Sequence, residues 1–189
     1  MFSLFKRSAS AEDLASVMWE GTRDWPAKYG AAMREACGGS FERSIEEVFD
    51  EMVYFLAFAT DYAFWCQLEK TPQVQNAVRS IFTARVREFA QEHRCGPIPS
   101  GDWLGDGLIW MPSGTTVAGE PLANLERRFA LYGQSLSRRH DRPAGERTAH
   151  ILAALCGTMS IVFITYASPL FVGRWDGVRA ILGSFNVRA

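Results

Sequence analysis

Asp61 is the ionisable residue whose sequence neighbours suggest chemistry. In a helix predicted over residues 44–70 it shares one stripe with Tyr54, Phe58 and Trp65, so a carboxylate points where aromatic side chains point. A buried carboxylate must find a partner or take up a proton. We expect either a structural bond to an arginine, a tyrosine hydroxyl or a helix end, or a polar group at the base of an aromatic pocket that orients a ligand or transfers a proton.

His150 is the second candidate for chemistry. It opens a long apolar segment, and it can reach Asp61 if the two long helices of the chain pack together. A lone histidine in such a position is more often a cap or a core residue. Asp61, His150 and a tyrosine such as Tyr54 or Tyr166 are therefore the catalytic candidates of an alternative hypothesis, an enzyme without a recognisable local motif.

Aromatic residues indicate a binding function more directly. The helix over 44–70 carries more of them than one buried face can use, and the Gly/Pro-rich segment 95–119 adds two tryptophans. The predicted ligand or partner surface comprises Tyr54, Phe58, Asp61, Trp65, Trp103 and Trp110. We expect the aromatic helix and segment 95–119 to form a groove for a protein partner, a second copy of the chain or an apolar small molecule.

Several familiar chemistries are disfavoured. The chain has no phosphate-binding loop, no dinucleotide fingerprint and no nucleophile elbow, and none of its three histidines follows an acidic residue at the di-iron spacing. Glu146 and His150 are four residues apart, but two ligands do not make a metal site. We predict no metal and no cofactor. The formal net charge of −1 also makes nucleic acid an unlikely partner.

Capping and breaking residues predict an all-α fold. Ser10 with Asp13 starts a first helix, expected to end at Gly21, and Pro26 lies in the first turn of a second helix. Ser44 with Glu47 starts the long aromatic helix. Further helices follow Pro72 and Pro121, and 95–119 is expected to be an irregular loop with a small hairpin that turns on 105–107. These signals predict a bundle of about five to seven helices.

Segment 150–172 contains no Lys, Arg, Asp or Glu and is expected to be the central element. Its length permits a membrane span, but its hydroxyl residues, Gly157 and Pro169 favour a buried helix that ends near the proline. Membrane attachment through 151–172 is possible but not favoured.

Charge predicts which helices are neighbours. Carboxylates dominate residues 42–69, whereas arginines dominate the amphipathic segments on both sides of 95–119, so these helices are expected to pack beside one another. The alternative for the acidic cluster Glu46, Glu47, Asp50 and Glu51 is a partner-docking surface or a weak cation site.

The 189 residues are expected to form one helical domain, with residues 1–9 flexible. The N-terminus lacks the apolar stretch of a secretory signal, and the four cysteines have no zinc-site spacing. We therefore expect free thiols and a cytoplasmic location, with self-association or a protein partner.

Overall fold

The computed structural model describes residues 7–36, 41–104, 109–116, 118–137, 144–158 and 160–188. Within these ranges there are six helices, α1 (Ala11–Ala36), α2 (Ile45–Gln67), α3 (Pro72–Glu92), α4 (Pro121–Ser137), α5 (Ala144–Leu155) and α6 (Ile161–Ser184). Four short strands accompany them, β1 (Arg7–Ser10), β2 (Pro99–Leu104), β3 (Ile109–Thr116) and β4 (Phe185–Arg188). The predicted all-α bundle is confirmed.

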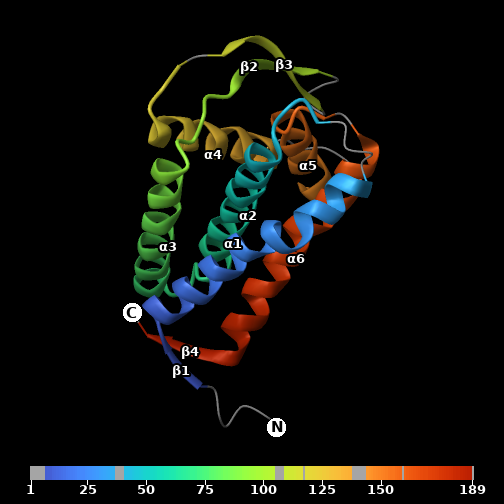
Figure 1. Ribbon diagram of the computed structural model, residues 1–189. Helices are drawn as coiled ribbons and strands as arrows, with labels where there is room; N and C mark the ends of the chain where they lie inside the picture. Colours follow the sequence, from blue (N-terminus) through green and yellow to red (C-terminus); the bar gives the residue numbers. More distant parts are fainter. Residues whose placement is uncertain are drawn as a thin grey trace.

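The strands lie at opposite ends of the bundle (Figure 1). Antiparallel β2 and β3 form a hairpin at the end where α4 crosses above α2 and α3, and parallel β1 and β4 pair at the other end. Trp103 of β2 stands opposite Trp110 of β3, as the predicted hairpin requires, whereas its turn at 105–107 lies outside the described residues. Residues 7–9, expected to be flexible, belong to β1.

Helix α2 is the centre of the fold, because it contacts all five other helices. Every residue from 51 to 60 is buried. On one side α2 packs with α1 and α3 around Phe64 and Phe82, and on the other it packs with α4, α5 and α6 around Phe55 and Phe163. Segment 150–172, expected to be central, is instead divided between two helices.

Gly157 causes this division. Its backbone has φ +69°, and α5 ends there with hydrogen bonds from Gly157 N to Ala154 O (3.1 Å) and from Thr158 N to Ala153 O (2.9 Å), the Schellman arrangement. Helix α6 then runs past Pro169 to Ser184, so the prediction of one helix ending at the proline was wrong. Pro169 is exposed, and water can therefore hydrate the carbonyl that lacks its donor. Among the described residues, no helix has the length and apolar character needed to cross a bilayer.

The caps of α1 and α2 have the predicted geometry. Asp13 N donates to Ser10 Oγ and Ser10 N donates to Asp13 Oδ2, and Ser44 and Glu47 make the same reciprocal pair. However, α1 is one continuous helix through Gly21 and Pro26, so the prediction of two short helices was wrong.

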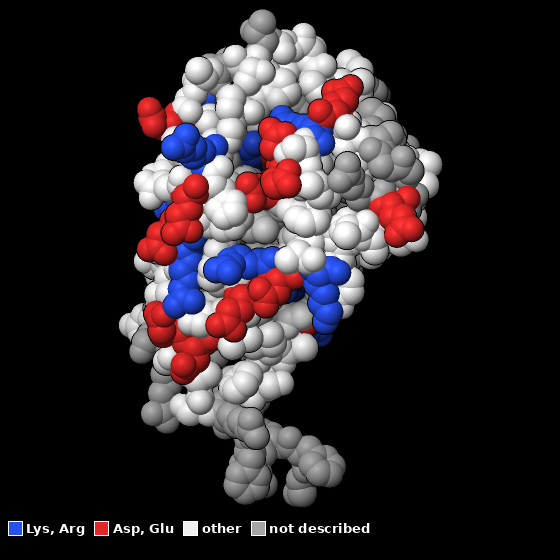
Figure 2. Space-filling model, in the orientation of Figure 1, with Lys and Arg blue, Asp and Glu red and all other residues white. Residues whose placement is uncertain are grey.

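Acidic α2 packs beside basic α3 and α4, as predicted, and the pairs Asp61–Arg79 and Glu51–Arg128 join them. Figure 2 shows Lys/Arg and Asp/Glu side chains interspersed over one face rather than gathered by sign.

Candidate functional site

A cavity with a volume of about 480 Å³ lies between the β2–β3 hairpin and α4. We call it the hairpin groove. Its apolar walls are Ile98, Trp103, Trp110 and Leu131, and its polar lining includes Ser100, Arg127 and Gln134. It holds the two tryptophans that the sequence assigned to a ligand surface.

Three features give the hairpin groove its form. A side chain on Gly101 would place its Cβ 2.3 Å from the indole of Trp110, so the glycine lets that ring lie across β2. Trp103 Nε1 donates to Gln134 Oε1 at 3.3 Å and ties the hairpin to α4. Trp110 is only 3% exposed, so it is a core residue that presents one edge to the groove.

A second cavity of about 210 Å³ lies between the first turns of α2, the end of α3 and α4. We call it the polar pocket. Its lining includes Arg43, Asp50, Tyr54, His93, Arg94 and Arg128. At its wall Arg128 Nε donates to both carboxylate oxygens of Glu51, at 2.9 and 3.0 Å, and both side chains are 2% exposed. This is a fully buried ion pair.

The same arginine anchors the segment between the two cavities. Arg128 Nη1 donates to Gly96 O at 2.6 Å, and Asn124 Nδ2 donates to Cys95 O at 2.9 Å. These bonds from α4 hold the chain that leads from α3 into β2. This segment lines the polar pocket at residues 95 and 96 and the hairpin groove from residue 98 onward.

Tyr54 and Cys95 add neutral donors to the polar pocket. Burial raises the pKa of the Tyr54 phenol far above its ordinary value, and the neighbouring Cys95 thiol and Asp50 carboxyl contribute to the rise. Burial also raises the pKa of the Cys95 thiol. Both groups therefore keep their protons at neutral pH.

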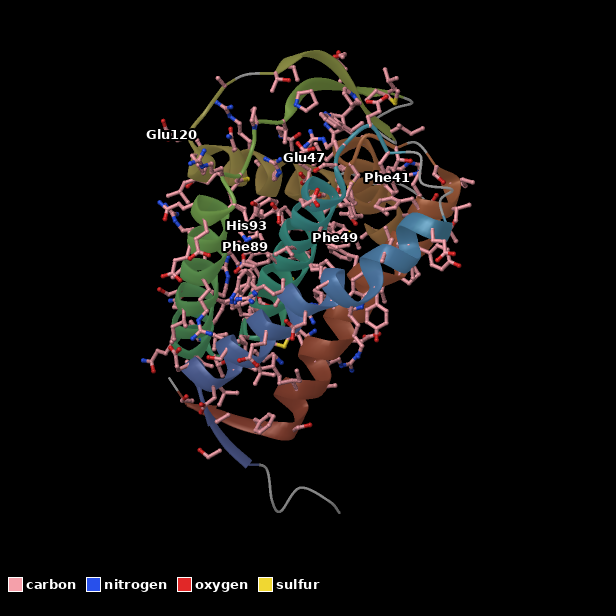
Figure 3. All side chains as sticks on the ribbon, viewed as in Figure 1. Phe41, Glu47, Phe49, Phe89, His93 and Glu120 are labelled. Atoms are coloured by element: carbon pink, nitrogen blue, oxygen red, sulfur yellow. The ribbon has the colours of Figure 1, made fainter. Side chains whose placement is uncertain are left out.

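His93 and Asp50 form the outer pair of the polar pocket, with His93 Nδ1 2.9 Å from Asp50 Oδ1. Burial raises the pKa of the Asp50 carboxyl, against the opposing effect of His93. Figure 3 shows His93 at the end of α3, beside Phe89, and Glu47 at the start of α2, both at the hairpin end of the molecule.

The structure gives Asp61 a structural partner. Arg79 on α3 donates to both of its oxygens at 2.8 Å, which is the arginine bond expected as the simpler outcome. Trp65 is 52% exposed, whereas Tyr54 and Phe58 are 2% and 7% exposed and belong to the core. The six residues of the predicted surface therefore do not form one face.

His150 is buried in α5, and its Nε2 lies 4.0 Å from Glu146 Oε1 on the same helix. Tyr54 lies about two turns from Asp61 along α2 and lines the polar pocket, which the other two candidates do not. Catalysis by Asp61 and His150 stays a prediction. Three residues of the acidic cluster considered as a docking surface or cation site, Glu47, Asp50 and Glu51, line the polar pocket, whereas sequence reasoning did not select His93, Cys95 or Arg128.

Among the described residues, no group of His, Cys, Asp and Glu side chains has the arrangement of a metal site. Comparisons with protein-family models, curated proteins and solved structures found no match for this chain.

Proposed function

We propose that the protein binds a small, largely apolar and aromatic molecule with a polar end in the hairpin groove. The observation that carries this proposal is the groove itself, whose volume falls within the range of about 300–1,000 Å³ that small-molecule sites occupy. Its walls combine the indole of Trp103 and one edge of Trp110 with aliphatic side chains, which suits contact with an aromatic ligand. Arg127 and Gln134 on α4 are placed to contact the polar end.

The composition of the groove favours binding over catalysis. Its described lining contains no His, Cys, Asp or Glu, so it offers no group of the kind that usually transfers protons near neutral pH. The hydroxyl of Ser100 has no histidine beside it in that lining. The alternative of an enzyme using Asp61 and His150 has less support, because Arg79 occupies both oxygens of Asp61.

Titration with the fluorescent aromatic anion anilinonaphthalene sulfonate tests the proposal. We expect saturable binding at one site, weakened at least tenfold in Trp103→Ala. The matched control is Trp65→Ala, which removes an exposed indole that is not part of the groove lining and should leave binding unchanged. Circular dichroism checks that both variants are folded. Absence of saturable binding, or equal losses in the two variants, would refute the proposal.

Self-association is the second candidate, and exposed apolar residues of α6 favour it. Ile161, Val162, Tyr166 and Val172 are 70%, 39%, 53% and 50% exposed, and all four lie in the first half of α6. Light scattering over a concentration series tests this candidate. Ile161→Asp should abolish a dimer, and a monomer at all concentrations would exclude it.

The cytoplasm is the compartment that the thiols support best. Cys66, Cys95 and Cys156 are free, which is typical of proteins in reducing compartments.

A further inference from the structure

The acidic side chains of the polar pocket are already engaged within the chain. Glu47 accepts a hydrogen bond from Ser44 N at 2.9 Å, and Asp50 pairs with His93. Glu51 is held by Arg128. None of the three carboxylates therefore needs a cation from outside.

The guanidinium groups are less completely used. Arg43 and Arg94 line the same cavity, and the guanidinium group of neither has a hydrogen bond or ion pair with a residue that the structure describes. Arg128 donates through Nε and Nη1, and no described group accepts from its Nη2. The three arginines and three carboxylates of the pocket have no net formal charge when His93 is neutral. What the pocket has in excess is hydrogen-bond donors without acceptors, not positive charge.

Tyr54 supplies an independent observation. Its side chain is 2% exposed and lines the pocket, and its hydroxyl has no nitrogen or oxygen partner among the described residues, its polar neighbour being the Cys95 thiol, a weak hydrogen-bonding group. Buried hydroxyls nearly always have such a partner, since leaving one unpaired destabilises the fold. The phenol keeps its proton and can therefore donate a hydrogen bond to an acceptor in the pocket.

Arg94 occupies an unusual backbone position for its type. It has φ +48° and ends α3, where Cys95 N donates to Ala90 O at 2.7 Å. Glycine is the usual residue there, because a side chain strains the left-handed conformation. The strain is consistent with a role for the guanidinium.

We infer that the polar pocket binds a small oxyanion, a carboxylate or phosphate group, through Arg43, Arg94 and the Tyr54 hydroxyl. Oxygens of such a group accept charge-assisted hydrogen bonds from guanidinium groups, and a planar or tetrahedral anion of this size fits within about 210 Å³. This site is separate from the hairpin groove and does not depend on it.

Isothermal titration calorimetry with inorganic phosphate and with succinate, at constant ionic strength, tests the inference. We expect saturable binding of at least one anion, weakened at least tenfold in Arg43→Gln, in Arg94→Gly and in Tyr54→Phe. Arg94→Gly should fold at least as well as the parent, because glycine relieves the backbone. Tyr54→Phe keeps the ring and removes only the hydroxyl, so it should also fold.

The control is Arg179→Gln, which removes an exposed arginine of α6 outside the pocket and should not change the affinity. Binding of succinate alone identifies a carboxylate ligand, and binding of phosphate alone identifies a phosphoryl group. Failure of both anions to bind saturably would overturn the inference. An equal loss of affinity in Arg179→Gln would also overturn it, because the anion would then be attracted by the overall charge of the protein and not by the pocket.

Discussion

Replacement of Arg128 by methionine should be among the most destabilising single changes to the polar groups of this fold. Both partners of the Glu51–Arg128 pair are 2% exposed, and the shortest distance between Nε and a carboxylate oxygen is 2.9 Å. At an effective dielectric constant of about 20 the attraction is about 6 kcal/mol. Methionine fills similar space but leaves Glu51 without its cation and Gly96 O without its donor.

The expected loss in the free energy of unfolding is about 3–5 kcal/mol, which is typical when one partner of a buried pair is removed. Urea denaturation followed by tryptophan fluorescence measures it. The matched control is Asp61→Asn, which breaks a pair whose arginine and aspartate are 34% and 17% exposed. That change should lower the free energy of unfolding by at most about 1 kcal/mol.

A double variant separates the charge effect from packing. Changing both Glu51 and Arg128 to methionine removes both charges, so it should cost less than Arg128→Met alone. The reasoning is refuted if Arg128→Met and Asp61→Asn cost the same, or if the two single changes at 51 and 128 simply add in the double variant.

Two further predictions concern a helix end and the thiols. Gly157→Ala should lower the free energy of unfolding by about 1–3 kcal/mol, because φ is +69° and the new Cβ would lie 2.8 Å from Glu42 Cβ. Gly133→Ala, inside α4, should instead raise the free energy of unfolding by about 0.5–1 kcal/mol. Equal urea midpoints for these two variants would contradict this. In a Cys37→Ser protein, a thiol reagent should modify half-buried Cys66 before Cys156, because complete burial shields Cys156 and raises the pKa of its thiol. Mass spectrometry measures the two rates, and modification of Cys156 as fast as Cys66 would count against the burial argument.

Local signals in the sequence predicted the starts of α1, α2, α3 and α4, whereas the start expected at Pro26 was wrong. The reciprocal bonds of Ser44 with Glu47 need only four consecutive residues, and a proline at the start of α3 needs no distant partner. Such features depend on backbone groups that any helix leaves unpaired, so they can be recognised without knowledge of the tertiary fold.

The sequence predicted less well whether a helix continues or ends at a glycine, because contacts with neighbouring elements determine this. Gly21 was expected to end α1, yet the helix continues and packs closely against α6, where Arg174 donates to Met18 O and to Thr22. Gly157 was expected to lie inside a helix, yet it ends α5 and accepts a hydrogen bond from Glu42 N. The local propensity of glycine is the same in both places, and the neighbouring elements differ.

The choice between Asp61 and Glu51 shows what helical spacing alone omits. Both carboxylates fall among aromatic residues of α2, but Asp61 lies where burial declines toward the helix end, and Glu51 lies in the fully buried stretch 51–60. The position of a carboxylate along the helix axis, rather than the helix face on which it lies, therefore determines whether its ion pair is accessible or buried. A second signal was present in α4, where Arg128 lies at helical spacing between the apolar residues Leu125 and Tyr132. A lone charge inside an apolar seam is costly, and two such charges of opposite sign on two helices predict that the helices meet at those residues.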